Sequence, residues 1–328
     1  MIPRGLLYTE WKKNQWLFLL SSIFLIAANP FMVYNNYVTY QGCLNHPAPQ
    51  DCEFVVSYTN GSLLSFSWVV SVIIAVFLLG LERTKGTMDA LLSMPYSRSQ
   101  IFQTKFWLGG IVIVVPQAIG YGAASLLIFL LKLSHTYDFD HSSIGMIVIS
   151  FMAYALLMAS GALTGHIFAQ LLTAFTVTIL PFLLIGLPAA NLEVVFDFSI
   201  GNEFSFISSY IESRLFIFVT PIGYVFNDWI RERHLILLIP AVMSVVFYLI
   251  GYVSFLKHPN ERNGRFFLWR KLERPVQLLV IAFAVMGFGV FGYGVTDTMF
   301  GYLAGIIIGA VIGFLISYFT VYRKTKHM

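Results

Sequence analysis

Hydrophobic residues occur along this chain in long uninterrupted runs. Stretches without Asp, Glu, Lys or Arg cover, in order, Trp16–Tyr34, Ser62–Leu81, Phe106–Leu131, Ser143–Leu192, Leu235–Leu256, Pro275–Thr296 and Thr298–Tyr322. A helix that spans a bilayer needs about 20 mostly apolar residues. Six of these runs suit one crossing each, and the 50-residue run Ser143–Leu192 suits two crossings joined by a turn near Gly165–His166. The pattern therefore predicts eight transmembrane segments.

These segments are predicted to be helices. Every backbone group in the bilayer core must find a hydrogen-bond partner in the protein, which only helices and closed barrels achieve. Barrel strands alternate apolar and polar residues, whereas runs such as Ile111–Val115 and Ile306–Ile308 do not alternate. We therefore expect an all-α polytopic membrane protein.

The loops carry a strong charge asymmetry, which predicts the orientation. With the N-terminus placed in the cytoplasm, 16 of the 20 Lys and Arg residues lie on the inner side and 11 of the 16 Asp and Glu residues on the outer side. The net charge of +4 is thus +11 inside and −7 outside. An even number of crossings then places both termini in the cytoplasm.

Composition excludes several classes of protein. The 328 residues are 58% hydrophobic and only 11% charged, with a mean hydropathy of +0.76, whereas soluble domains carry roughly 25% charged residues. A soluble enzyme, a disordered chain, a coiled coil and a nucleic-acid-binding domain are therefore unlike this sequence.

The pattern also predicts the organisation of the chain. Residues 1–15 form an interfacial helix or an ordinary basic flank, 16–256 form a six-helix core, 257–274 form a basic cytoplasmic loop, and 275–328 form a two-helix hairpin with a basic tail. Within the core, residues 190–234 form a long outer segment. Its charge-free stretch Leu215–Phe226 is too short to span, so we expect a re-entrant element or part of a small outer domain.

Two outer loops carry candidate chemistry. Cys43 and Cys52 are the two cysteines of the chain and lie in one outer loop, where oxidising conditions favour a disulfide. A zinc site there is the weaker alternative, because only His46 is a nearby additional ligand. The next outer loop contains His135, Asp138, Asp140 and His141. A solvated acidic loop is favoured over a metal site, since no fixed ligand spacing is visible.

The inner loop Leu81–Phe106 has the clearest local signals. Thr87 can cap a short helix with Asp89 in its first turn, and Pro95 ends that helix near Ser93 or Met94. Ser97 and Gln100 then form a capping box that starts the next helix. A short amphipathic helix at the membrane surface is a natural docking element for a soluble partner.

The same loop resembles a known family. The pattern Glu82-Arg-x-x-Gly86-Thr87-x-Asp89-x-Leu91-Leu92-Ser93-x-Pro95-x-Ser97-Arg98-x-x-Ile101-x-x-x-Lys105 is similar to the signature of ABC-2-type transporter permeases, the membrane subunits of type V ABC exporters. In that family this loop, here residues 82–105, holds the coupling helix that contacts the ATPase. The family's usual core has six crossings, so the last two helices are a departure. The length and extra helices resemble the branch associated with acetoin utilisation and cell-envelope stress in Gram-positive bacteria.

The resemblance implies a multi-pass permease subunit in a bacterial cell membrane. Two permeases, identical or related, would assemble with two cytosolic ATPases, which would bind ATP and Mg while this chain binds no cofactor. The residues implied for the coupling interface are Glu82, Arg83, Thr87, Asp89, Leu91, Leu92, Pro95, Tyr96 and Arg98. The expected activity is ATP-driven movement, in the family's export direction, of an apolar or amphipathic substrate.

The sequence lacks the motifs by which a transporter would bind ATP or relay ions itself, which is consistent with energy supplied by another protein. No G-x-x-x-x-G-K-[S/T] phosphate loop occurs in the sequence, and no predicted crossing contains a charged residue that could serve as a proton or ion relay. The alternatives are a membrane scaffold or sensor that recruits a cytosolic partner without transport, and a lipid-modifying enzyme. The enzyme is disfavoured because no set of catalytic residues is visible.

A glycine stripe marks the last predicted helix. Gly301, Gly305, Gly309 and Gly313 recur at every fourth position, and such small-residue stripes permit close helix packing. We expect a tight hairpin with the preceding helix, and packing against another subunit is the alternative.

Overall fold

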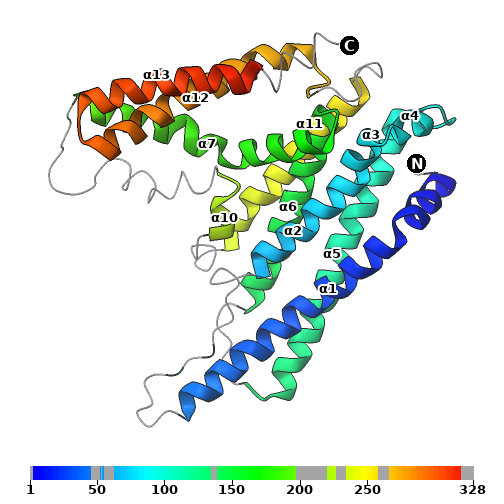
Figure 1. The fold of residues 1–328 in the computed structure, drawn as a ribbon. Helices are drawn as coiled ribbons and strands as arrows, with labels where there is room; N and C mark the ends of the chain where they lie inside the picture. The colour runs from blue at the N-terminus through cyan, green and yellow to red at the C-terminus, as the bar shows by residue number, and fades with distance from the viewer. Residues whose placement is uncertain are drawn as a thin grey trace. The chain divides into compact units, whose positions relative to one another are not determined.

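The computed structural model describes residues 3–45, 52, 54, 63–133, 139–196, 220–226, 234–257 and 266–318. Its elements are α1 (Arg4–Leu44), α2 (Leu63–Ala75), a π-helical turn η1 (Val76–Gly80), α3 (Leu81–Thr84), α4 (Thr87–Leu92), α5 (Arg98–Leu130), α6 (Phe139–Leu163), α7 (Ile167–Phe196), α10 (Gly223–Phe226), η3 (His234–Leu237), α11 (Leu238–Lys257), α12 (Arg270–Thr296) and α13 (Met299–Ser317) (Figure 1). Over these described ranges the chain has no β-strand and one isolated bridge, between Thr164 and Phe267.

The predicted fold class is confirmed. Eight helical segments of the described chain are long and apolar enough to cross a membrane: α1, α5, α6, α7, α12 and α13, together with Ser67–Thr84 and Leu235–Lys257. The segment Ser67–Thr84 joins α2, η1 and α3 into one continuous helical rod. Which side of the membrane each terminus occupies stays a prediction from the charge asymmetry.

Helix α1 is longer than the predicted first crossing. It extends to Leu44, so the predicted outer loop begins about ten residues later than expected, and Cys43 lies in the last turn of the helix. At its other end, Asn14 leaves the helical conformation with φ −113° and ψ 16°. This break separates an amphipathic N-terminal portion, Arg4–Lys13, from the membrane portion.

Contacts between Cα atoms divide the chain into two units, which we describe separately. Unit 1 comprises residues 1–162 and 224–257, and unit 2 comprises residues 163–223 and 258–328. Helix α7 thus belongs with the C-terminal hairpin, a grouping that hydropathy alone did not indicate.

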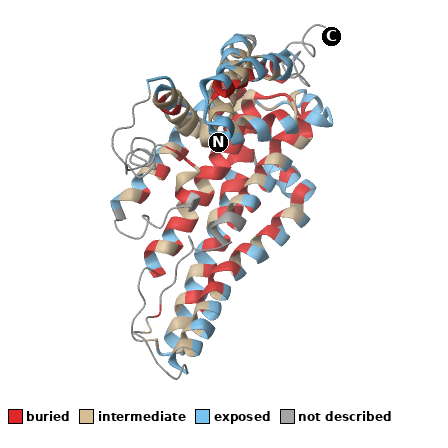
Figure 2. Cartoon of the chain, turned by 60° about the vertical axis from the view of Figure 1, so that its left-hand side comes forward, coloured by how far each residue is buried: buried red, intermediate tan, exposed pale blue. Residues whose placement is uncertain are grey.

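Unit 1 is a bundle in which α1 and α5 lie side by side (Figure 1). Their backbones approach closely at Gly120, where a Cβ atom would lie 2.7 Å from the carbonyl oxygen of Ile26. Helix α6 is the most buried crossing, and Figure 2 shows buried residues in stripes along the helices of this unit.

Polar contacts connect the helices of unit 1. Ser150 of α6 donates a 2.8 Å hydrogen bond to Ser67 of α2. The hydroxyl of Tyr154 donates to the carbonyl oxygens of Lys105 and Phe106, at 3.0 and 3.1 Å. This places the Tyr154 ring against Gly109, one of the positions at which α5 has no side chain.

The predicted outer segment 190–234 is described only in part. Residues 190–196 complete α7, Thr220–Phe226 includes the short α10, and His234 begins η3. Tyr224 is buried in an apolar cluster with Met146 and Ile149 of α6. The remainder, including residues 215–219 of the predicted re-entrant stretch, lies outside the described residues.

Unit 2 contains α7, α12 and α13. The turn before α7 pairs with the segment before α12, because Leu268 donates its backbone N–H to Leu163 at 2.9 Å. His166 accepts the backbone N–H of Ala169 at its Nδ1 atom, 3.1 Å away, and so caps α7. Asn191 of α7 donates to the carbonyl of Met286 and accepts from the hydroxyl of Tyr302, which ties α7 to both hairpin helices.

The glycine stripe of α13 faces α12. A Cβ atom at Gly305 or Gly309 would collide with the backbone carbonyl of Phe288 or Ala284, respectively. The same holds at Gly301, which meets the Gly292 carbonyl, and Gly313 lies against the Ala284 side chain. The two helices therefore pack backbone to backbone within one chain.

Candidate coupling site

The loop between the second and third crossings forms two short helical elements and a turn. Gly86 adopts a left-handed conformation, φ +71°, that L side chains rarely adopt, and this residue ends α3 and starts α4. The prediction that Thr87 caps α4 is wrong, because Gly86 holds the N-cap position and the Thr87 hydroxyl instead donates to the Glu82 carbonyl at 3.3 Å. Asp89 does lie in the first turn.

The start of α5 is confirmed in detail. Ser97 accepts the backbone N–H of Gln100 at 3.2 Å, and the Gln100 side chain accepts the N–H of Ser97 at 3.0 Å. The reciprocal pair satisfies two backbone donors of the first helical turn. The sequence of the loop therefore fixes where α5 begins, directly after Pro95 and Tyr96.

Helix α4 has a buried side and an exposed side. Met88 is fully buried and Leu91 is 8% exposed, as their spacing of three residues on one helical face allows. Leu92 is half-buried. The opposite side exposes Thr87, Asp89, Ala90, Ser93 and Met94, which we call the exposed α4 surface.

Helices α1, α3 and α5 bring together four charged side chains, of which all but Lys13 are buried; these are Glu10, Lys13, Glu82 and Lys105, which we call the charge cluster. The Lys105 ammonium lies 2.7 Å from Glu10 Oε1 and 2.7 Å from Glu82 Oε2, and Lys13 lies 2.6 Å from Glu82 Oε1. The first of these contacts is an aligned hydrogen bond, whereas the Lys105–Glu82 contact is an ion pair without that alignment.

Burial makes the charge cluster energetically important. The Lys105 side chain is 0% exposed and those of Glu10 and Glu82 are each 3% exposed, while Lys13 is 46% exposed. Two carboxylates and two ammonium groups give no net charge. A buried charge that loses its partner destabilises a protein by about 3–5 kcal/mol, so this arrangement holds α1, α3 and α5 in one register.

Further residues of the loop contact helix α11. Arg83 is buried, with its guanidinium 5.8 Å from the ring centroid of Phe255 in α11. Arg98 donates to the Leu256 carbonyl at 3.3 Å, and Ser99 shares a 2.9 Å hydrogen bond with Tyr252. The loop is thus attached to the last turns of α11 as well as to α1 and α5.

The predicted coupling residues therefore separate into two groups. Thr87, Asp89 and Pro95 are exposed, whereas Glu82, Arg83 and Leu91 are buried within unit 1. Leu92, Tyr96 and Arg98 are intermediate, and the Tyr96 hydroxyl lies 3.1 Å from the position of a Cβ atom at Gly5 in α1. The exposed group can contact a partner, and the buried group can only position the loop.

Sequence reasoning missed the charge cluster. Glu10 and Lys13 entered the sequence analysis only through the charge asymmetry, and Lys105 only through that asymmetry and the family pattern. The signal was present, because the four residues alternate in sign and flank three crossings at the same predicted membrane face. Charges that must sit near the bilayer are expected to pair with one another.

The outer candidates are partly described. Cys43 and Cys52 are joined by a disulfide. Asp140 accepts a 2.7 Å hydrogen bond from the Tyr121 hydroxyl, and His141 is buried, while His46, His135 and Asp138 lie outside the described residues. No group of three or more His, Cys, Asp or Glu residues in the described part of the chain could hold a metal ion.

Comparison with known proteins places the geometry in context. The model of the ABC-2 family of transporter proteins matches residues 6–189. Over 328 residues the chain is 58% identical to "Probable ABC transporter permease YtrC" of Bacillus subtilis (strain 168), covering 99% of this chain and 100% of that protein. It is 49% identical over 330 residues to "Probable ABC transporter permease YtrD" of the same strain, covering 99% of each.

Proposed function

The chain belongs to the ABC-2 family of transporter proteins and is a multi-pass permease subunit of the cell membrane, and from this premise we propose that it couples ATP hydrolysis by a separate cytosolic ATPase to the export of an apolar or amphipathic substrate. Two permeases and two ATPases form the transporter, and ATP and Mg bind to the ATPases. This chain contributes the membrane path and the docking surface.

The observation that carries the proposal is that α4 has an exposed surface and directly follows α3, which holds Glu82 of the charge cluster. A protein that binds Thr87, Asp89, Ala90, Ser93 and Met94 touches a six-residue helix whose other side is buried in unit 1. That helix follows α3, and α3 holds Glu82 of the charge cluster. Force applied to α4 therefore reaches α1 and α5 through buried ion pairs.

The packing around α5 is suited to transmitting a displacement of α4 to the neighbouring helices. A close-packed interior transmits displacement, because its side chains have little room to yield. The aromatic rings of Phe102, Phe106 and Tyr248 pack against one another between α5 and α11, with centroid separations of 4.7 to 6.1 Å. A push on α4 is thus expected to move α5 and α11 together and to tilt the bundle of unit 1.

The substrate class follows from the lack of charge in the crossings. The only charged side chains within the described helices of unit 1 lie near the predicted inner ends, apart from Asp140. A strongly charged molecule would find no counter-charge along such a path. An apolar or amphipathic molecule needs none.

The test is association with the ATPase. Ala90→Arg places a long cation on the exposed α4 surface without changing the buried side of α4. Tagged full-length chain, purified from its native membranes, should bring down a subunit with a phosphate-loop motif, and Ala90→Arg should reduce that yield about tenfold or more, since a misplaced charge at an interface costs several kcal/mol. Lys271→Glu, an exposed charge reversal at the start of α12, is the control and should leave the yield unchanged. Undiminished recovery with Ala90→Arg would refute the docking assignment.

A further inference from the structure

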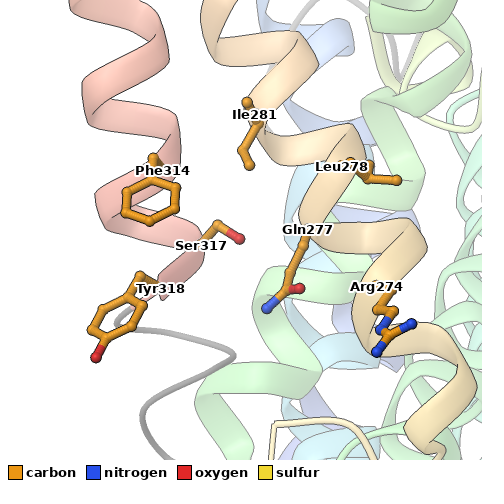
Figure 3. A pocket seen from close by; sticks show the side chains of 7 residues that line it. All are labelled: Arg274, Gln277, Leu278, Ile281, Phe314, Ser317 and Tyr318. Atoms are coloured by element: carbon orange, nitrogen blue, oxygen red, sulfur yellow. The ribbon is translucent and has the colours of Figure 1, made fainter.

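Helices α12 and α13 enclose a groove at the end of the hairpin that holds the start of α12 and the end of α13. The groove has a volume of about 480 Å³ and is lined by Arg274, Gln277, Leu278, Ile281, Phe314, Ser317 and Tyr318. Figure 3 shows Gln277 of α12 and Ser317 of α13 extending into the space between the two helices, with Arg274 one turn from Gln277 on α12. The groove lies wholly within unit 2.

The lining is divided into a polar and an apolar part. Arg274, Gln277 and Ser317 supply hydrogen-bond donors, and Leu278, Ile281 and Phe314 supply an apolar wall. The lining contains no acidic residue. Ser317 is only 4% exposed, so its hydroxyl belongs to the floor of the groove and not to the open surface.

Arg274 is an exposed cation at the right depth for a lipid headgroup. The membrane-spanning segments of the hairpin cover Lys271–Thr296 and Met299–Ser317, so Arg274 and Ser317 lie at the same end of both crossings. None of the ion pairs found among the described residues involves Arg274. Its guanidinium can therefore make bidentate hydrogen bonds to a phosphate.

We propose that this groove binds one anionic phospholipid, with the phosphodiester on Arg274 and Gln277 and an acyl chain along Leu278, Ile281 and Phe314. The charge of Arg274 selects an anionic headgroup over a zwitterionic one, because a zwitterion brings its own cation to the site. The positive-inside asymmetry puts the groove in the cytoplasmic leaflet, where juxtamembrane cations meet anionic lipid. The site lies outside residues 6–189, which the family model covers, and does not depend on the proposed ATPase coupling.

The groove also explains the composition of the hairpin end. Close packing through the glycine stripe ends at Gly313, which lies against Ile281 and Ala284. Beyond that point, one turn later on α13, Ser317 faces the larger space beside Gln277. The helices thus separate where the headgroup region begins, and the space between them is large enough for part of a lipid.

The experiment measures lipid retention by native mass spectrometry. Full-length chain is purified in a mild detergent and titrated with phosphatidylglycerol or, separately, phosphatidylethanolamine. The wild-type chain should retain one phosphatidylglycerol about tenfold more than phosphatidylethanolamine. Arg274→Gln should remove that preference, and Lys271→Gln, which deletes an exposed cation that does not line the groove, should keep it.

Two further measurements make the outcome decisive. Thermal unfolding in lipid-free detergent should be the same for Arg274→Gln and the wild type, so that lost binding does not reflect lost folding. Added glycerol 3-phosphate at millimolar concentration should not displace the lipid, because the apolar wall contributes to binding. Equal retention of both lipids by the wild type, or equal losses in the two variants, would overturn the proposal in favour of a non-specific lipid shell. Displacement by glycerol 3-phosphate would overturn it in favour of a simple phosphate site.

Discussion

Replacing Lys105 by Met tests the charge cluster most sharply, because Met keeps the length of the side chain and deletes the ammonium. In the wild type this group neutralises Glu10 and Glu82 at 2.7 Å each. After the substitution Glu82 keeps Lys13, whereas Glu10 loses its ion-pair partner while remaining 3% exposed. The cost should be about 3–5 kcal/mol of unfolding free energy, the range for an uncompensated buried charge.

The assay is equilibrium unfolding of the purified chain in mixed micelles, followed by the fluorescence of its tryptophans. Lys85→Met is the matched control, since Lys85 is exposed in the same loop and surface substitutions change stability by about 0.5 kcal/mol or less. Adding Glu10→Gln to Lys105→Met removes the stranded charge and should recover a coupling energy of about 1–3 kcal/mol.

Two results would refute this reasoning. A loss below about 1 kcal/mol for Lys105→Met would mean that the ammonium is solvated, and burial of the charge cluster would then be wrong. A double variant no more stable than the single variant would mean that Glu10 and Lys105 do not interact. Either result would also remove the link by which α4 is proposed to act on α1.

Three further predictions follow from close contacts and from the outer disulfide. Gly109→Ala should destabilise the chain by about 1–3 kcal/mol through overpacking, because its Cβ atom would press into the Tyr154 ring. Gly122→Ala in the same helix is the control: its Cβ atom has nothing within 4 Å, so the change should be neutral or stabilising by up to ~1 kcal/mol. Thermal unfolding compares the two variants, and equal effects would contradict the packing of Tyr154 against Gly109. Gly305→Leu should separate α12 from α13, because its Cβ atom would already meet the Phe288 backbone. Gly294→Leu is the control, since a Cβ atom there has nothing within 4 Å. Proteolysis that cuts the two variants equally would argue against the hairpin. The native chain should resist alkylation at Cys43 and Cys52 until reductant is added, and mass analysis that finds free thiols without reductant would rule out the disulfide.

The sequence predicted the fold class because hydropathy is set by the solvent around each segment, and lipid demands long apolar runs. It also predicted the start of α5, since the Ser97–Gln100 capping box is a local interaction. The prediction that Thr87 caps α4 was wrong because Gly86, in a left-handed conformation, occupies the N-cap position. A glycine can adopt many backbone conformations, so the sequence alone does not show which one it takes.

Contacts between helices that are distant in the sequence could not be predicted from hydropathy. Every crossing has an apolar exterior, so hydropathy cannot show which helices pack together, and it did not indicate that α7 contacts α12. Its actual neighbours are indicated by a polar residue: Asn191 bonds to Met286 and Tyr302 of the hairpin. Buried polar side chains must find partners, and they are therefore the best sequence markers of packing in a protein that is otherwise apolar.

The central claim, that the exposed α4 surface receives a cytosolic ATPase, is tested most directly by site-specific crosslinking in native membranes. A benzophenone attached at Ser93→Cys lies on that surface, and one attached at Ile307→Cys, on the 65% exposed side of α13, serves as the control within the membrane. Irradiation should join the Ser93 probe, and not the Ile307 probe, to a subunit that carries a phosphate-loop motif, and ATP with Mg should alter the yield. Failure of the Ser93 probe to capture such a subunit, when intact transporter is present in the same membranes, would contradict the claim.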